Sequence, residues 1–202
     1  TIPHFLLILN HKTRRNPMKI IAQLLFAAIA FAPVLAALDV GDDSPCFSAR
    51  DDKGKDWSAC DFLDKKNVIV YFYPAAMTGG CTKQACSYRD GADQLKKLDA
   101  VVVGVSGDQV EALKYFKIAE KLNFTLLSDA KGEIAKAFGV PTRPGGTLQR
   151  TVQGKEVTLV RDNTASRWTF VINKKGRIIY KNSKVNPTKD LTEVAKAIKA
   201  SK

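Results

Sequence analysis

Apolar segments of two kinds alternate along the chain, and their order predicts a layered α/β fold. The first kind is continuous and rich in β-branched residues, as in strands that are buried on both faces of a sheet. Three such runs cover residues 67–73, 100–106 and 124–129. The second kind repeats its apolar positions with a helical period, over residues 82–98, 108–122, 132–140 and 187–200. Asp108 is a candidate N-cap, and Pro187 suits a first helical turn.

Hairpin patterns flank these runs. Residues 46–59 alternate around Asp-Asp-Lys-Gly-Lys, and residues 167–173 pair with 176–183 across Lys-Lys-Gly. Residues 142–166 carry turn signals that predict one short hairpin. Strands that alternate with helices pair in parallel, whereas hairpins add antiparallel strands. We therefore expect one domain over 38–202, with an α/β thioredoxin-like fold, a mixed central sheet flanked by helices and an extra N-terminal β-hairpin.

The segment before this domain has the composition of a secretory signal. From Met18 the chain has a short basic region with Lys19, then an apolar run, then a small-residue exit near Ala36. Residues 18–36 are therefore predicted to be a signal peptide, and residues 1–17 an upstream extension that is not native. The alternative is an uncleaved membrane anchor, but the run is short for a span of about 20 residues.

Removal of this segment would change the chemistry available to the protein. His4 and His11 both precede residue 37, so the exported domain would have no imidazole for a Cys-His or Ser-His-Asp site. Its net charge would fall from +12 to +8, because four basic residues are lost. The remaining basic residues are spread without an aromatic stripe, which favours a solvated surface over a nucleic-acid or membrane partner.

The segment 71–90 carries the candidate chemistry. It reads YFYPAAMTGGCTKQACSYRD, and its P-x-x-x-T-x-x-C pattern resembles the active-site segment of peroxiredoxins. SRWTFVIN, further along, resembles the segment that carries this family's catalytic arginine. The second cysteine, five positions after the first, resembles the bacterioferritin-comigratory or peroxiredoxin Q branch. The resemblance implies a peroxide site of Pro74, Thr78, Cys81 and Arg167, with Cys86 as the resolving thiol.

What the resemblance implies about activity can be stated concretely. Hydrogen peroxide, with organic hydroperoxides as further substrates, would oxidise Cys81 to a sulfenic acid without metal, haem or other cofactor. A thioredoxin-like dithiol would reduce the resulting disulfide. We expect a monomer or weak dimer, with no nucleic-acid partner and no stable membrane insertion once the signal is cleaved.

Elementary chemistry supports the same assignment of roles. A strand that ends at Pro74 and turns through Gly79 and Gly80 delivers Cys81 to the first turn of a helix. Free N–H groups and the helix dipole favour anions there. An arginine stays charged and offers a planar fork of donors, and a thiolate is the nucleophilic form of cysteine.

The C-x₄-C spacing predicts a conformational switch. Residues five apart on a helix are separated by a rise of about 7.5 Å and point about 140° apart. A disulfide requires Cα atoms within about 4.4–6.8 Å. Cys81 and Cys86 can therefore join only if the helix unwinds. The polar Thr-Lys-Gln between them and the nearby Gly91 suggest that unwinding is easy.

Cys46 and Cys60 lie at the open end of the first hairpin. If the turn centres on Lys53, the two cysteines face each other across the strands. In an oxidising compartment this favours a structural disulfide. Two buried thiols are the alternative, and four cysteines allow three pairings in all.

Three other classes of protein remain open. A thiol-disulfide oxidoreductase of the same fold would normally carry C-x-x-C, which is absent from this sequence. A copper-delivery protein would require a closer cysteine pair and a histidine. A non-catalytic module whose cysteines only stabilise the fold would not cycle with peroxide. Residues 142–166 also form a longer connection than the one expected in the bacterioferritin-comigratory branch. This difference leaves the preferred substrate and any dimer contact open.

Overall fold

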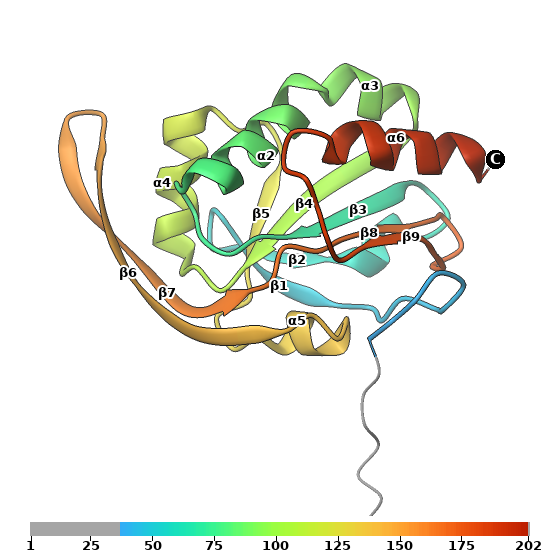
Figure 1. The fold of residues 1–202 in the computed structure, drawn as a ribbon, viewed down its shortest axis with the longest axis horizontal. Coiled ribbons are helices and arrows are strands. Elements are labelled where there is room, and N and C mark those ends of the chain that lie inside the picture. Colours follow the sequence, from blue (N-terminus) through green and yellow to red (C-terminus); the bar gives the residue numbers. More distant parts are fainter. Residues whose placement is uncertain (1–36, 202) are drawn as a thin grey trace, which may run out of the picture. The chain divides into compact units, whose positions relative to one another are not determined.

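A mixed seven-stranded sheet forms the centre of the computed structural model, which describes residues 37–201 (Figure 1). The strand order is β2-β1-β5-β4-β3-β8-β9. These strands are β1 (Ser48–Asp51), β2 (Asp56–Ser58), β3 (Asn67–Phe72), β4 (Ala100–Ser106), β5 (Thr125–Ser128), β8 (Thr169–Ile172) and β9 (Ile178–Asn182). The central β3, β4 and β5 run parallel, and the outer strands pair antiparallel. The predicted thioredoxin-like sheet with its extra N-terminal hairpin is therefore confirmed.

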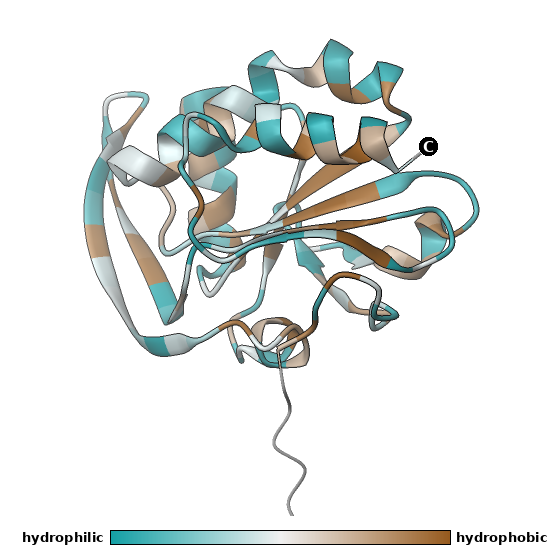
Figure 2. Ribbon diagram, turned by 45° about the vertical axis from the view of Figure 1, so that its right-hand side comes forward, coloured by the Kyte–Doolittle hydropathy of each residue, from teal (hydrophilic) through white to brown (hydrophobic). Residues whose placement is uncertain are grey.

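Helices cover both faces of this sheet. They are η1 (Ala59–Phe62), α2 (Gly79–Asp90), α3 (Ala92–Lys97), α4 (Val110–Glu120), α5 (Glu133–Ala137) and α6 (Asp190–Ala200). Alternate residues of β3 enter two separate cores: Ile69 and Tyr71 pack with α2, α3, α4 and α6, whereas Val70 and Phe72 pack with η1 and α5. Figure 2 shows the resulting apolar strands enclosed between more polar outer surfaces. Burial on both faces explains why β3 lacks polar alternation.

Three helix boundaries differ from the predicted ones. The helix expected over 82–98 is two helices that meet at Gly91, where a Cβ atom would collide with Leu191 of α6. The last helix begins at Asp190 rather than at Pro187. Asp108 does not cap α4, because its buried carboxylate accepts from the backbone N–H of Ala76 instead. The first and third differences arise from contacts between segments far apart in the sequence.

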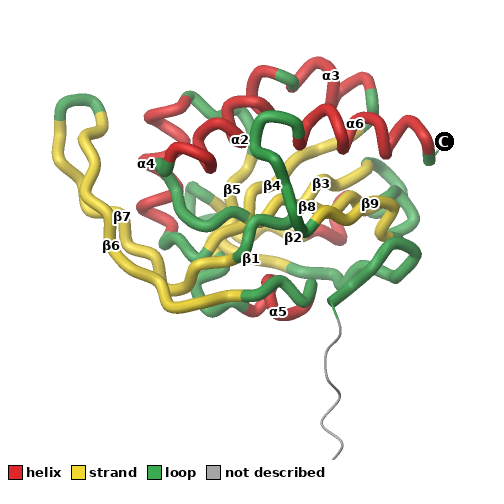
Figure 3. The backbone as a smooth tube through the Cα atoms, viewed as in Figure 1, coloured by secondary structure: helices red, strands yellow, loops and turns green. Residues whose placement is uncertain are grey.

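The predicted short hairpin at 142–166 is in fact a long one. Strands β6 (Thr142–Val152) and β7 (Lys155–Ala165) form a separate two-stranded sheet, visible in Figure 3 as a pair of strands that extends past α4. Gln153 and Gly154 both have positive φ, at 51° and 79°, as a two-residue type I′ turn requires. We call β6, its turn and β7 the arm. Backbone bonds from Gln109 to Val160 and from Asp162 to Gly107 attach it to the body.

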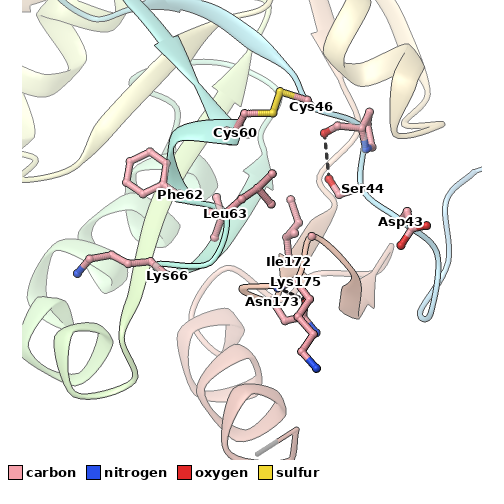
Figure 4. A pocket seen from close by; sticks show the side chains of 14 residues that line it. Asp43, Ser44, Cys46, Cys60, Phe62, Leu63, Lys66, Ile172, Asn173 and Lys175 are labelled. Atoms are coloured by element: carbon pink, nitrogen blue, oxygen red, sulfur yellow. Dashed lines mark hydrogen bonds between the residues drawn. A yellow bond between two sulfur atoms is a disulfide. The ribbon is translucent and has the colours of Figure 1, made fainter.

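A disulfide joins Cys46 to Cys60, with the Cα atoms 5.5 Å apart. The register of β1 and β2 pairs Ser48 with Ser58, and continuing it by two pairs places these two cysteines opposite each other. Figure 4 shows the bond at the rim of a cavity that Phe62, Leu63 and Ile172 help to line. The bond therefore closes the open end of the hairpin, as the symmetric spacing predicted.

Removing this bond should destabilise the fold. We expect the Cys46→Ser/Cys60→Ser double variant to lose about 3 kcal/mol of unfolding free energy, because the bond closes a loop with a sequence separation of 14. Urea denaturation of the oxidised protein against the variant measures the difference. Equal midpoints and slopes for the two proteins would show that the bond contributes nothing to stability.

Candidate active site

The backbone between β3 and α2 delivers Cys81 to a helix N-terminus. After Pro74 the chain turns through Met77, whose φ is 55°, and Thr78 takes the extended N-cap conformation. The first bond of the helical type runs from Thr82 N to Thr78 O at 2.8 Å. The first backbone N–H groups of α2, up to that of Cys81, therefore lack helical acceptors. They carry the positive end of the helix dipole toward the sulfur.

The guanidinium of Arg167 contacts this sulfur directly. Its Nη2 lies 3.3 Å from Cys81 Sγ, and its Nη1 donates to Gln84 Oε1 at 2.6 Å. Arg167 lies in the connection between β7 and β8, and a Cβ atom at Gly80 would be 3.2 Å from Nη2. Glycine at position 80 therefore lets the guanidinium approach closely. Cys81 itself is only 1% exposed, so its sulfur meets a cation rather than bulk water.

A buried hydrogen-bond network holds Gln84 in place. Gln84 Nε2 donates to Oδ2 of Asp190 at 2.7 Å, and the same oxygen accepts from Tyr88 OH at 2.7 Å and Thr169 Oγ1 at 2.9 Å. Asp190 is fully buried. Burial raises the pKa of its carboxyl, and the three hydrogen bonds oppose this rise. One continuous chain of polar contacts thus links Cys81 to Arg167, Gln84 and Asp190.

The polar residues between the two thiols are not all solvent-exposed. Gln84 is fully buried and bonded at both ends of its amide. Gly91 lies beyond the segment that must unwind and ends α2 against α6. Unwinding the start of α2 therefore breaks specific buried hydrogen bonds.

Thr78 and Pro74 belong to the segment that leads into α2 and make different contacts. Thr78 Oγ1 donates to the carbonyl of Ala75 at 2.9 Å, which leaves its lone pairs free to accept. Pro74 and Arg167 line a shallow cavity of about 360 Å³, together with Arg143 at the base of the arm. Arg167 therefore contacts Cys81 on one side and shares an opening with Pro74 on the other, while Thr78 caps the helix that carries Cys81.

Cys86 lies on α2, away from this cluster. Its half-buried thiol is 3.5 Å from Glu120 Oε2 of α4. Burial raises the pKa of the Cys86 thiol, Arg89 lowers it, and Glu120 raises it further. Both Cys81 and Cys86 are free thiols on the intact helix. The structure thus presents the state in which the two sulfurs are kept apart.

Inspection of the sequence missed three residues of the site. Gln84 had a detectable signal, because a residue three positions after Cys81 shares its helix face. Asp190 resembled an ordinary acidic residue at the start of a helix. Arg150 had no signal: it lies on β6, and its Nε donates to the carbonyl of Met77 at 3.2 Å. This bond holds the turn before α2 against the arm.

Comparison with known proteins agrees with this geometry. The AhpC/TSA family model matches residues 40–181. Chloroplastic peroxiredoxin Q of Populus jackii is 39% identical over 169 residues, which are 83% of this chain and 71% of that protein. Chloroplastic peroxiredoxin Q of Sedum lineare is 39% identical over 84% of this chain and 82% of its own length.

A solved structure shares the fold. Peroxidoxin BcpB of Mycobacterium tuberculosis superposes with a TM-score of 0.68 at 30% identity, over 82% of this chain and 99% of its own. These matches favour a peroxidase over an oxidoreductase with C-x-x-C, a copper-delivery protein or a non-catalytic module. The chain belongs to the AhpC/TSA family and is a thiol-dependent peroxidase of the peroxiredoxin Q type.

Proposed function

We propose that Cys81 is the residue that peroxide oxidises. Its thiolate attacks the outer oxygen of a hydroperoxide, the O–O bond breaks, and the S–O bond forms. Cys81 becomes a sulfenic acid, and the leaving oxygen takes a proton to give water or an alcohol. The observation that carries this proposal is the 3.3 Å contact between Arg167 Nη2 and Cys81 Sγ at the start of α2.

Charge stabilisation gives the surrounding residues their roles. Negative charge moves from sulfur to the leaving oxygen during attack, so donors fixed near both atoms lower the barrier. Arg167 provides a permanent cation with two N–H arms, and the first N–H groups of α2 add the positive end of its dipole. Thr78 Oγ1 has lone pairs that can accept a hydrogen bond from the peroxide O–H, and Pro74 forms one wall of the opening. No cofactor is required for this step.

We propose that Cys86 resolves the sulfenic acid. Its thiol attacks the oxidised sulfur of Cys81, the S–O bond breaks, water leaves and a disulfide forms. Helix geometry requires the start of α2 to unwind first, because the intact helix keeps the sulfurs too far apart. Peroxiredoxins are recycled by thioredoxin-like reductants, and for this chain we propose an external dithiol that reduces the Cys81–Cys86 disulfide by exchange.

The products of a single turnover test this scheme. One equivalent of hydrogen peroxide should give a Cys81–Cys86 disulfide in the wild type, found by peptide mapping without reduction, while Cys46–Cys60 stays unchanged. Cys86→Ser should consume its first equivalent at the wild-type rate and accumulate sulfenic acid at Cys81, which a dimedone probe traps. Further peroxide should then oxidise it to sulfinic acid. Trapping of the label at any other cysteine would contradict the proposed roles.

We also propose that the domain acts outside the cytoplasm, as a monomer or weak dimer. Two features support export: the signal-like segment 18–36, which lies outside the described residues, and the Cys46–Cys60 disulfide, a bond typical of oxidising compartments. Among residues 37–201, the structure shows no helix with the length and hydropathy of a membrane span. Sequencing the N-terminus of the protein from a secreted fraction would test cleavage near Ala36.

A further inference from the structure

We propose that Asp190 of α6 is a positioning residue that orients Arg167 through Gln84 and holds α2 in its folded, peroxide-reactive state. The proposal rests on the function proposed above, because it assigns a regulatory role to the network behind Cys81. Asp190 touches neither Cys81 nor Arg167 in the hydrogen bonds of the described residues. The hydrogen-bonded route from Asp190 to Arg167 runs through Gln84.

The first part of the proposal follows from the chemistry of an amide. A glutamine side chain has one end that accepts and one that donates, and Arg167 can use only the accepting end. The carboxylate of Asp190 likewise accepts only the donating end of Gln84, at 2.7 Å. Asp190 therefore fixes the amide so that its oxygen faces Arg167 Nη1 at 2.6 Å. That bond in turn directs the other arm, Nη2, toward Cys81.

The second part follows from the positions of the donors. Of the three groups that donate to Asp190 Oδ2, Gln84 and Tyr88 belong to α2 and flank Cys86 in the sequence, whereas Thr169 belongs to β8. Unwinding between Cys81 and Cys86 must move Gln84 and so remove a donor from a fully buried carboxylate. Its other oxygen, Oδ1, already lacks a hydrogen-bond partner among residues 37–201. A buried anion that loses donors is destabilised, so Asp190 opposes unwinding.

The rate of peroxide attack and the rate of resolution should therefore change in opposite directions when Asp190 is altered. Attack needs an oriented Arg167 and a folded α2, whereas resolution needs an unwound one. A residue that only stabilised the protein would not produce this combination. Glu193, one turn further along α6, is a matched control, because it accepts from Tyr180 and Asn182 of β9 and from no group of α2.

The test measures both steps in Asp190→Asn, which keeps the shape of the side chain but can present a donor to Gln84. Stopped-flow mixing with hydrogen peroxide should show Cys81 oxidation slowed about tenfold. In free-energy terms this loss has the usual size for two residues that share a hydrogen-bond network. Disulfide formation from the sulfenic acid should speed up severalfold, and excess peroxide should produce less sulfinic acid. Glu193→Gln should match the wild type in all three measurements.

A double-mutant comparison separates positioning from a general loss of order. In an Arg167→Lys background, Asp190→Asn should slow attack by less than about twofold, because the guanidinium it orients is absent. An equal loss in both backgrounds, slower resolution, or wild-type rates in Asp190→Asn would each overturn the proposal. If Asp190→Asn does not fold, Gln84→Met removes the α2 donor that unwinding must displace and should still slow attack and speed resolution; an unchanged resolution rate would then overturn the proposal. Absence of Cys81-dependent turnover in the wild type would instead refute the proposed function.

Discussion

Cys81→Ser is expected to abolish peroxide reduction, with kcat/KM lowered by at least about 10⁴-fold, the scale on which enzymes lose activity without their nucleophile. A serine hydroxyl stays protonated beside Arg167 and has no accessible sulfenic state. The substitution is small and the site is 1% exposed, so the fold should persist. Stopped-flow peroxide consumption with a dithiol reductant in excess measures the loss.

Cys86→Ser and the Cys46→Ser/Cys60→Ser double variant are controls for this experiment. The first removes the other free thiol and the second removes the disulfide, while both leave Cys81 and Arg167 in place, so each should keep the fast first oxidation. Peroxide consumption that survives Cys81→Ser at more than about 1% of the wild-type rate would assign the reaction to another residue.

Arg167→Gln should have the second largest effect, a loss of about 10²- to 10³-fold in the rate of Cys81 oxidation. The variant removes the cation and the donor 3.3 Å from the sulfur, and it leaves Gln84 Oε1 without its 2.6 Å partner. Arg167→Lys keeps the charge but not the planar fork, so it should recover only part of the rate. Sulfenic acid trapping under single-turnover conditions measures both variants.

Arg50→Gln is the matched control for charge alone. Arg50 is an exposed arginine on β1 whose side chain is 64% accessible, and its ion pair with Asp56 lies on the surface. We expect the rate of Cys81 oxidation in Arg50→Gln to stay within about twofold of the wild-type rate, as for most surface substitutions. A rate for Arg167→Gln within the same range would show that the guanidinium contact is not used in catalysis.

Local patterns were enough to predict most of the sheet and the candidate nucleophile. The β-branched runs predicted β3 and β4, because burial on both faces leaves a continuous apolar signature. The symmetric spacing of Cys46 and Cys60 about one turn predicted their pairing, since a hairpin register is set by its turn. The peroxiredoxin resemblance named Cys81 and Arg167 together, and the structure places them in contact.

Other features depended on contacts between distant segments, and sequence patterns carry little record of these. The arm was underestimated because few positions of its strands are buried and apolar, namely Val152, Leu159 and Ala165, and the strands are defined by pairing and attachment to the body. Arg150 reaches a carbonyl 73 residues away, on the turn before the nucleophile. The boundary at Gly91 depends on a side chain of α6.

The sequence by itself determined the strands of the sheet, the hairpin disulfide and the position of Cys81 at a helix N-terminus, because each depends on neighbouring residues and on local geometry. Only the tertiary structure decided that Gln84 and Asp190, 106 residues apart, hold Arg167 and α2 together. A buried glutamine and aspartate look like surface residues in a sequence. They can lie in the core only because the fold supplies donors and acceptors that compensate for their loss of water.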